Sequence, residues 1–287
     1  MPTDSSCFPP GFPDVFYKYR QWSRLNDHGE REPVALHQRV LANCEIFFAS
    51  ASDFNGPFDS SIPLRYDKLT KGQLLNIIES HVRADNPRFR KSEVAKRARD
   101  LYAKQNWRNL TNIDNVGKMM AERIGIFSAA KSSDNILMWS HYSASHTGFC
   151  IGVDTASFDR ACRNAVAKRG PNSPIVVARW VEYEKEYPLL VPYNMTDEQK
   201  VIDPMCKKAE DWKYEKEIRL FMLNGSRIAL CLPRQAIREV IFGCRMSEID
   251  KGEIKDILTQ QFDHVVLYQA EMLAHSFGLQ CVKLKPC

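Results

Sequence analysis

The sequence predicts an α+β fold in which a mixed, largely antiparallel β-sheet forms the core and a helical segment is inserted. β-favouring runs come first, and helices interrupt them without the regular βαβ alternation of a doubly wound parallel sheet. The composition shows neither a linker-like shift nor an internal repeat. We therefore expect residues 1–14 to form a lead and residues 15–287 to fold as one domain, with the helical insertion at about 70–120.

The individual elements follow from local patterns of residues. Apolar residues that recur one turn apart predict helices, and Thr70 with Gln73 forms a capping-box pattern. β-branched and aromatic runs between turn-forming residues predict strands. Helices are expected at 34–43, 70–120, 136–144, 196–214, 234–239 and 247–261. Strands are expected at 15–20, 44–50, 123–130, 149–154, 175–183, 217–223, 227–233, 239–244, 265–271 and 279–285.

Two local signals make these expectations more specific. Asn224-Gly225 is a strong turn signal, so the strands 217–223 and 227–233 are expected to pair as a hairpin. Asp134 or Asn135 is placed to cap the short helix that follows.

Composition restricts the class of protein. Hydrophobic residues make up 44% and charged residues 26%, as in ordinary globular proteins. No apolar run approaches the roughly 20 residues that span a bilayer. The first residues, MPTDSSCFPPGFPD, lack the basic and apolar regions of a secretory signal. We expect a cytoplasmic protein with no membrane partner.

Common ligand-binding motifs are missing from the sequence. The nine cysteines are scattered without a CxxC pair, which favours reduced thiols and predicts no metal site. There is no GxGxxG, GxxxxGK[ST], HExxH or GxSxG motif. Rossmann-type and P-loop nucleotide binding are therefore disfavoured.

The formal charge of +5 is unevenly placed. Residues 83–108 are rich in Lys and Arg, against which stand only Asp85, Glu93 and Asp100. Such a segment can attract a nucleic-acid or protein acceptor, or it can form an ordinary solvated helix surface.

Four clusters combine polar, aromatic and turn-forming residues near strand ends. In the first, the strand period places Lys18 and Arg20 on one face and Tyr17 and Tyr19 on the other. Two adjacent cations can hold a pyrophosphate, and two tyrosines can stack on a flat ring. An amphipathic edge strand is the alternative.

The second cluster is FASASDFNGPFD (48–59), which contains Ser50, Phe54 and Asn55. So many turn-forming residues beside phenylalanines predict a rigid loop that either binds a ligand or packs on its own aromatic rings.

The third cluster is MWSHYSASHTG (138–148). His141 and His146 are five apart and do not share a helical face, which disfavours a metal pair. His141 is a candidate acid–base group, with Tyr142 beside it, and a structural histidine is the alternative.

The fourth cluster is WKYEKEIR (212–219). Glu215 and Glu217 are two apart at the start of a strand, so both can point into one cleft. A carboxylate there can bond a ribose hydroxyl or activate a nucleophile. An alternating charged strand edge is the alternative.

These clusters, in this order, resemble a bacterial family of domains of unknown function, DUF2971. The resemblance is carried by YKYR (17–20), FASASDFNGPFD (48–59), MWSHYSASHTG (138–148) and WKYEKEIR (212–219). Gly56 stands where the family usually has Asp, which puts a role for that loop carboxylate in doubt. The family name itself implies no activity.

A more distant resemblance is to ADP-ribosyltransferases, in particular the DarT-type DNA-modifying enzymes and the RNA 2′-phosphotransferases. It implies an ADP-ribosyltransferase-like fold and NAD as a substrate, with no metal. Tyr19 or Arg20 would contact the NAD ribose, Ser50 would line the nicotinamide pocket, and Glu217 would bind the ribose 2′-hydroxyl.

Physical chemistry extends these implied roles. Glu217 would stabilise an oxocarbenium-like state and Glu215 would orient or deprotonate the acceptor. The site residues expected overall are Glu217, Glu215 and His141 for catalysis, and Tyr17, Lys18, Tyr19, Arg20, Ser50, Phe54, Asn55 and Tyr142 for NAD binding.

The leading hypothesis is thus NAD-dependent ADP-ribosyl transfer to a macromolecular acceptor, in a bacterial setting such as phage defence or a toxin-like system. One alternative is a non-catalytic module that binds nucleic acid or nucleotides. Another is a defence partner protein whose pocket senses a ligand without turning it over.

Overall fold

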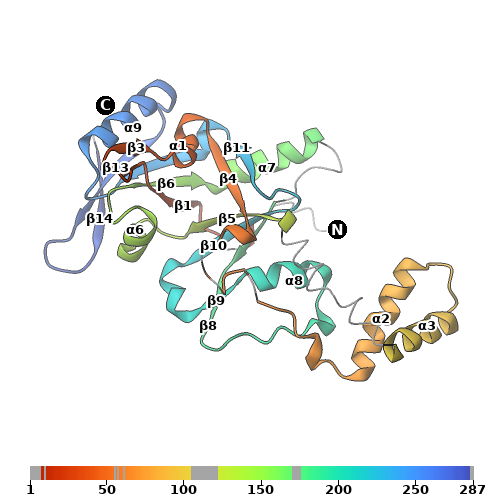
Figure 1. The fold of residues 1–287 in the computed structure, drawn as a ribbon. Helices are drawn as coiled ribbons and strands as arrows, with labels where there is room; N and C mark the ends of the chain where they lie inside the picture. Colours follow the sequence, from red (N-terminus) through yellow and green to blue (C-terminus); the bar gives the residue numbers. More distant parts are fainter. Residues whose placement is uncertain are drawn as a thin grey trace. The chain divides into compact units, whose positions relative to one another are not determined.

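The computed structural model describes residues 8–9, 11–54, 56, 58–60, 62–104, 122–169 and 176–284 (Figure 1). Two compact units are present in it. Unit 1 comprises residues 1–49, 124–181 and 210–287, and unit 2 comprises residues 50–123 and 182–209. The helical insertion expected at about 70–120 falls within unit 2, and residues 105–121 of it lie outside the described residues.

A ten-stranded sheet forms the centre of unit 1. Its main path runs β11-β4-β5-β1-β6-β12-β13-β14, and β10 pairs with both β5 and β7. The strands are β1 (Val15–Arg20), β4 (Glu45–Ser50), β5 (Gly125–Ala130), β6 (Phe149–Asp154), β7 (Val176–Trp180), β10 (Glu217–Met222), β11 (Ile228–Cys231), β12 (Ile237–Phe242), β13 (Val266–Met272) and β14 (Leu279–Lys283).

The pairings of β1 with β5 and β6, of β10 with β5 and β7, of β11 with β4, of β12 with β6 and of β13 with β14 are antiparallel, and β12 pairs with β13 in parallel. This confirms the prediction of a mixed, largely antiparallel sheet. Within the described residues of unit 1 the helices are α1 (Ala35–Ala42), α6 (Ile136–Tyr142), α7 (Thr155–Arg169) and α9 (Glu248–Gln261), with 3₁₀ turns η6 (Glu210–Glu215) and η7 (Arg234–Ala236). A small hairpin, β2 (Ser23–Leu25) and β3 (Arg31–Pro33), is tied to α9 by the Arg31–Asp250 ion pair at 2.5 Å.

Apolar side chains cover both faces of the sheet. The larger cluster includes Phe16, Phe127 and Leu220, and the smaller one includes Tyr19, Ala130 and Trp139. All six residues of β10 are buried because the strand lies between β5 and β7. A strand so enclosed has room for charged side chains only where they are paired.

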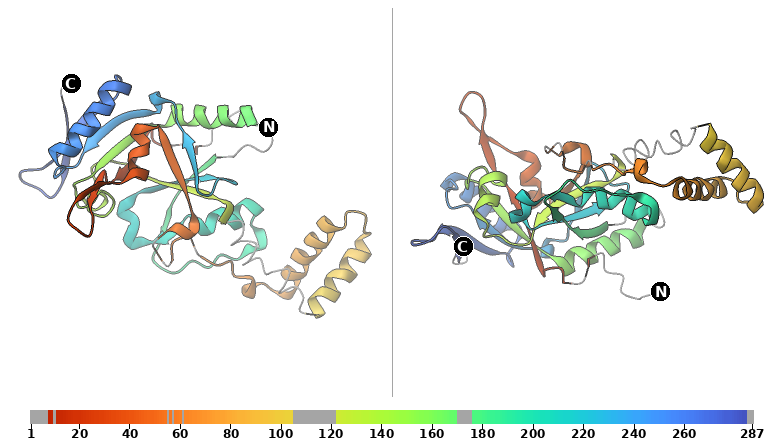
Figure 2. Two further views of the ribbon diagram at one scale, coloured as in Figure 1. Left: turned by 45° about the horizontal axis from the view of Figure 1, so that its top comes forward. Right: turned by 90° about the horizontal axis from the view of Figure 1, so that it is seen from below.

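Unit 2 contains two helices, α2 (Lys71–Asp85) and α3 (Lys91–Ala103), that pack together as a hairpin (Figure 2). The Thr70–Gln73 capping box at the start of α2 is confirmed. The other elements that the structure describes in unit 2 are η1 (Ala51–Asp53), η2 (Tyr66–Lys68), η4 (Pro192–Asn194), α8 (Asp197–Ile202), η5 (Asp203–Met205) and a parallel pair, β8 (Glu182–Glu184) with β9 (Lys207–Ala209). Among the described residues, no helix has both the length and the apolar character that a membrane crossing requires.

The predicted hairpin at Asn224-Gly225 is wrong. The turn forms, with the Gly225 amide donating to the Met222 carbonyl at 3.1 Å, but the flanking strands separate after it. β10 pairs with β5 and β7, whereas β11 pairs with β4. Both edges of β10 are thus occupied by other strands, so a favourable turn was not sufficient to pair it with β11.

One helix prediction also needs correction, and one helix was missed. The stretch 196–214 is helical only over α8, after which 3₁₀ turns and β9 follow, because Pro204 cannot continue an α-helix. Helix α7 directly after β6 was not predicted. Asn135 is the residue that caps α6, since its side-chain oxygen accepts from the amides of Leu137 and Met138.

Candidate active site

Lys18 lies where two strands of the sheet part. β1 pairs with β6 along its whole length but with β5 at one position only, Tyr17 opposite Ala130. Beyond that position the Lys18 ammonium donates to the carbonyl oxygen of Ser128 and lies 5.0 Å from the centre of the Phe127 ring. The Lys18 side chain thereby bonds the backbone of β5 at a place where the register of β1 with β5 has ended.

A second cation and a neutral histidine accompany Lys18. Burial lowers the pKa of Arg20 to about 10. Burial, followed by the charge of Arg20, lowers the pKa of His37 on α1 to about 4. The His37 Nδ1 lies 3.1 Å from the carbonyl oxygen of Gln21. Sequence reasoning did not single out His37, and its position on α1 gave no signal that it would meet β1.

The pKa of Lys18 is lowered well below its usual range, chiefly by burial and then by the charge of Arg20. Among the described residues, neither Lys18 nor Arg20 forms an ion pair with a carboxylate. Two partly buried cations are thus held side by side, as the alternation of YKYR predicted. Such an arrangement is electrostatically unfavourable until an anion joins it.

Helix α6 fixes the segment that carries the two glutamates. The Asn135 side-chain amide donates to the Tyr214 carbonyl oxygen at 2.7 Å, and the Tyr142 hydroxyl donates to Glu215 Oε1 at 2.5 Å. Glu215 is 3% exposed. Burial and the Glu215 carboxylate raise the pKa of Tyr142, so its hydroxyl stays protonated as a donor. The motifs around residues 138–142 and 212–219 are thus held together by direct hydrogen bonds.

Lys216, which separates the two glutamates, adopts a left-handed conformation with φ of 43°. The predicted strand alternation therefore does not include Glu215, which ends η6, while Glu217 begins β10. Both Glu217 oxygens accept from Arg219, at 2.7 Å from Nε and 3.1 Å from Nη2. Arg219 is fully buried and Glu217 is 5% exposed. The guanidinium thereby favours the ionised carboxylate and fixes its orientation.

The cations and the carboxylates influence one another across the sheet. Glu217 and Tyr17 both pair with Ala130, which puts them on the same face, opposite to Lys18. The charges of Glu217 and Glu215 nevertheless raise the pKa of Lys18 against the larger effect of burial. Lys18 and Arg20 on one face and the Glu217 carboxylate on the other thus lie near the same end of β5.

The tyrosines of β1 are packed into the smaller apolar cluster. Tyr19 is 3% exposed, meets the Trp139 ring edge-on at 5.2 Å, and donates its hydroxyl to the Ser132 carbonyl oxygen at 2.8 Å. Burial, followed by a hydrogen bond to Glu239, raises the pKa of Tyr17. Their predicted contacts with NAD remain predictions, and in the structure they anchor β1.

The predicted loop residues lie in unit 2. Ser50 is 2% exposed and caps η1, where its amide donates to Asp53 Oδ2 at 2.9 Å. Phe54 is partly buried, and Asn55 lies outside the described residues. The roles of all three in NAD binding remain predictions.

The two histidines of the third cluster differ in their surroundings. His141 is exposed, with its ring centre 6.3 Å from that of Tyr214. His146 stacks on Trp139 and lies 3.1 Å from the Ser140 hydroxyl, while its buried Nδ1 has no hydrogen-bond partner in the part of the chain described. Within the same part, no group of three or more His, Cys, Asp or Glu residues is arranged to hold a metal ion.

The backbone conformation of this motif explains why position 148 is glycine. Residues 144–146 are all left-handed, and a Cβ on Gly148 would lie 2.1 Å from the Arg20 carbonyl oxygen. The turn therefore needs glycine at 148 so that the backbone of β1 can approach.

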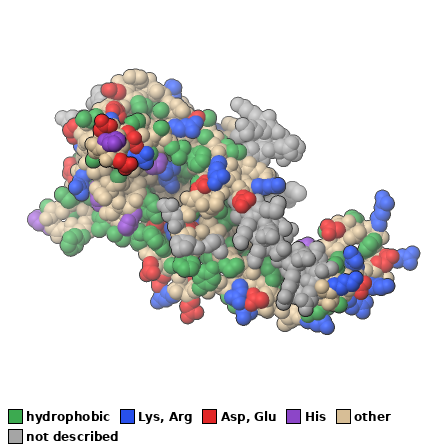
Figure 3. Space-filling view, in the orientation of Figure 1, with side chains coloured by type: hydrophobic (Ala, Val, Ile, Leu, Met, Phe, Trp, Pro, Cys, Tyr) green, Lys and Arg blue, Asp and Glu red, His purple; other side chains and the backbone are tan. Residues whose placement is uncertain are grey.

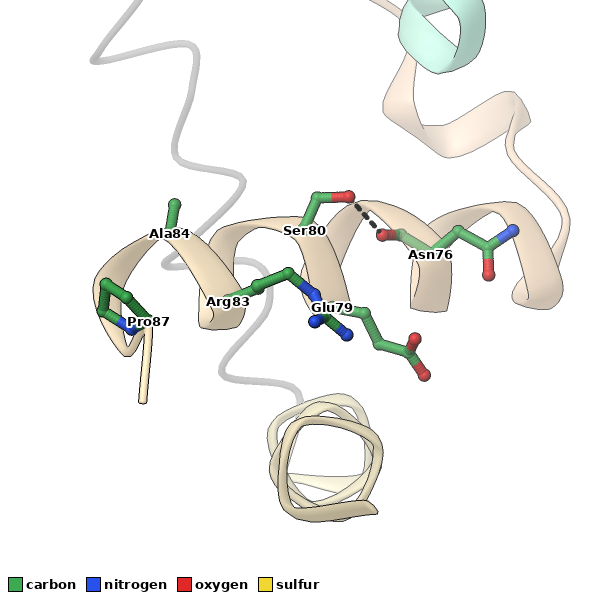
Figure 4. A pocket seen from close by; sticks show the side chains of 6 residues that line it. All are labelled: Asn76, Glu79, Ser80, Arg83, Ala84 and Pro87. Atoms are coloured by element: carbon green, nitrogen blue, oxygen red, sulfur yellow. Dashed lines mark hydrogen bonds between the residues drawn. The ribbon is translucent and has the colours of Figure 1, made fainter. Parts of the chain in front are cut away.

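A surface hollow lies elsewhere, on helix α2 in unit 2 (Figure 4). None of the predicted site residues lines it. Its lining consists of Asn76, Glu79, Ser80, Arg83, Ala84 and Pro87.

The segment that matches a known protein family includes α6 and β10, which carry part of the candidate site. Residues 138–220 match the model of a family described as a protein of unknown function (DUF2971). The matched segment runs from α6 through β10 and so contains Tyr142, Glu215 and Glu217. It supports the resemblance that the motifs indicated. No curated protein and no solved structure matches the chain significantly.

Proposed function

We propose that unit 1 binds NAD and transfers its ADP-ribose to an acceptor. The observations that carry the proposal are the partly buried cations Lys18 and Arg20 and the buried carboxylates of Glu215 and Glu217, whose charges act on Lys18 where β1 separates from β5. The resemblance to ADP-ribosyltransferases gives this arrangement its chemical interpretation. A non-catalytic ligand sensor remains the competing function.

The cations supply the binding argument. Burying an ammonium or guanidinium without a counter-charge costs several kcal/mol, and an anionic ligand removes much of that cost. A diphosphate carries charge on several oxygens, so both Lys18 and Arg20 can bond it at once. Protonated His37 would add a third donor when an anion is present, since its lowered pKa reflects burial and the charges of Arg20 and Lys18.

The carboxylates supply the chemistry. Heterolysis of the bond between the nicotinamide nitrogen and the ribose carbon leaves the bonding pair on nicotinamide, which departs as a neutral molecule. The positive charge that develops on the ribose is stabilised by a fixed carboxylate, and Glu217 is fixed by Arg219. The acceptor then attacks the ribose carbon, and Glu215 takes the proton that the acceptor loses.

The decisive experiment incubates the pure full-length protein with NAD labelled in the ADP-ribose moiety, with protein, DNA and RNA acceptors. Nicotinamide release and label transfer are measured for wild type and for Glu217→Gln. The variant keeps an oxygen that can accept from Arg219 but removes the negative charge, so we expect the rate to fall by about 100-fold or more. Glu210→Gln, at a 40%-exposed carboxylate on η6, is the matched control and should retain the wild-type rate.

A second variant tests whether Lys18 contributes to NAD binding. Lys18→Met keeps the length of the side chain and removes its charge, and we expect NAD binding measured by calorimetry to weaken at least about 10-fold. NAD binding without any nicotinamide release would favour the ligand sensor. Neither binding nor release by a folded wild-type protein would remove NAD from the proposal altogether.

A further inference from the structure

The surplus positive charge of the whole chain is carried by one helical hairpin. From Arg83 to Lys104 there are eight Lys and Arg residues against three Asp and Glu residues, a surplus of five that equals the formal charge of +5 of the chain. The remaining residues are therefore balanced. The eight cations are Arg83, Arg88, Arg90, Lys91, Lys96, Arg97, Arg99 and Lys104.

All eight cations are exposed. In the described part of the chain none of them forms an ion pair, and Arg99 donates only to the Ala95 carbonyl oxygen of its own helix. Lys and Arg side chains gather visibly over α2 and α3 (Figure 3). Like charges packed this closely repel one another, and the hairpin keeps them on a small apolar core that includes Leu74, Ile78, Val82 and Val94.

An aromatic ring lies in the middle of these charges. Phe89 is 41% exposed and stands between Arg88 and Arg90 in the turn that joins α2 to α3. No other large apolar side chain between Arg83 and Lys104, all of which the structure describes, is exposed. A single exposed ring among guanidinium groups is the combination that stacks on an unpaired base while the cations bond the adjacent phosphates.

We propose that this surface, the eight cations together with Phe89, binds single-stranded nucleic acid. A membrane is the weaker fit, because an interfacial helix needs an apolar stripe, whereas the exposed positions of α3 include Lys91, Ser92, Glu93, Lys96, Arg97, Arg99 and Asp100. An acidic protein would use the cations but would gain less from the exposed ring. Helix α3 has 13 residues and is about 20 Å long, enough for several consecutive phosphates.

The proposal is independent of the activity proposed for unit 1. It concerns residues of unit 2, and it predicts binding whether or not NAD is bound or consumed. Failure of either proposal can therefore be observed without the other.

The test measures fluorescence anisotropy of a labelled 20-nucleotide oligothymidylate with the full-length protein between 50 and 200 mM salt. The variant Lys96→Gln/Arg97→Gln/Arg99→Gln removes three cations and keeps good helix formers. Each cation that no longer neutralises a phosphate should reduce the salt slope by about 0.7, so we expect binding to weaken roughly 10- to 50-fold near 150 mM salt. Phe89→Ala should weaken binding of the single strand several-fold more than binding of a duplex of the same length.

The matched control removes three exposed cations from unit 1, as Arg24→Gln/Arg238→Gln/Lys283→Gln, and should bind like wild type. Equal binding by the α3 variant would overturn the proposal. Equal affinity for polyglutamate would show a general polyanion surface and overturn it as well. Binding to vesicles of anionic lipid, with none to the oligonucleotide, would assign the surface to a membrane instead.

Discussion

The two units of this protein both carry clusters of Lys and Arg, in opposite environments. Lys18 and Arg20 are partly buried between strands, and burial lowers both of their pKa values. The cations of α3 are exposed, where water and salt screen them. The comparison shows that clusters of like charge can differ in burial. On our two proposals, the buried cations bind a small anion and the exposed ones bind a long polyanion.

The largest expected effect is the loss of stability when a buried cation is removed, compared with the removal of an exposed one. Arg219→Met removes the guanidinium that bonds both oxygens of the buried Glu217, and we expect the free energy of unfolding to fall by about 3–5 kcal/mol. Arg97→Met on the exposed face should change it by about 0.5 kcal/mol or less. Denaturant titration compares the two.

Glu217→Gln combined with Arg219→Met provides the control for this prediction. Removing both partners should recover part of the stability, because no unpaired charge stays buried. A single Arg219 variant as stable as wild type would show that the pair is not desolvated as strongly as its burial implies.

The next largest effect is on how the stability of the protein depends on pH. The pKa of His37 is about 4 in the folded protein, below its ordinary value of 6.5, so the unfolded chain binds the proton more readily. Its contribution to stability is therefore complete above about pH 6.5 and is lost as pH falls towards 4. We expect the stability of wild type to fall by about 2 kcal/mol more than that of His37→Asn across this range, as measured by urea unfolding at each pH.

Adding pyrophosphate tests the same histidine, because a bound anion should change the pH dependence of stability. An anion bound beside Lys18, Arg20 and His37 would favour the protonated ring and reduce the pH dependence of wild type. Parallel pH profiles for wild type and His37→Asn would contradict a desolvated histidine at this position.

The smallest effect belongs to the exposed surface. Repulsion among its cations should make Lys96→Gln/Arg97→Gln/Arg99→Gln more stable than wild type by a few tenths of a kcal/mol at low salt. The difference should vanish at 1 M salt, where the screening length is about 3 Å. Melting curves at both salt concentrations check this, and a difference that does not depend on salt would exclude repulsion as its cause.

The sequence predicted those features of the structure that depend on residues close together in the chain. The alternation of YKYR, the capping box at Thr70 and the cap at Asn135 were all readable, because each involves contacts within a few residues. The expected chemistry of Glu215 and Glu217 drew attention to a segment whose two carboxylates are buried in the structure. The family match covers that segment as well.

Contacts between distant residues were not readable in the same way. Nothing in the sequence around His37 indicates that α1 would bring it towards Arg20, and Arg219 gave no sign that it would hold Glu217. The Asn224-Gly225 hairpin was wrong for a related reason, since other strands occupy both edges of β10. Tertiary pairing decided each of these cases.

The pairing of β1 has a consequence for how the protein is made. β1 (Val15–Arg20) acquires its full-length partner only when β6 (Phe149–Asp154) has been synthesised, and β5 (Gly125–Ala130) touches it at one position. During synthesis β1 therefore waits with unpaired edges, and contacts so distant in sequence form slowly. The candidate site therefore combines residues that are far apart in the sequence, from Lys18 to Glu217. A fragment limited to residues 138–220 would carry the glutamates without the cations, and so could not form it.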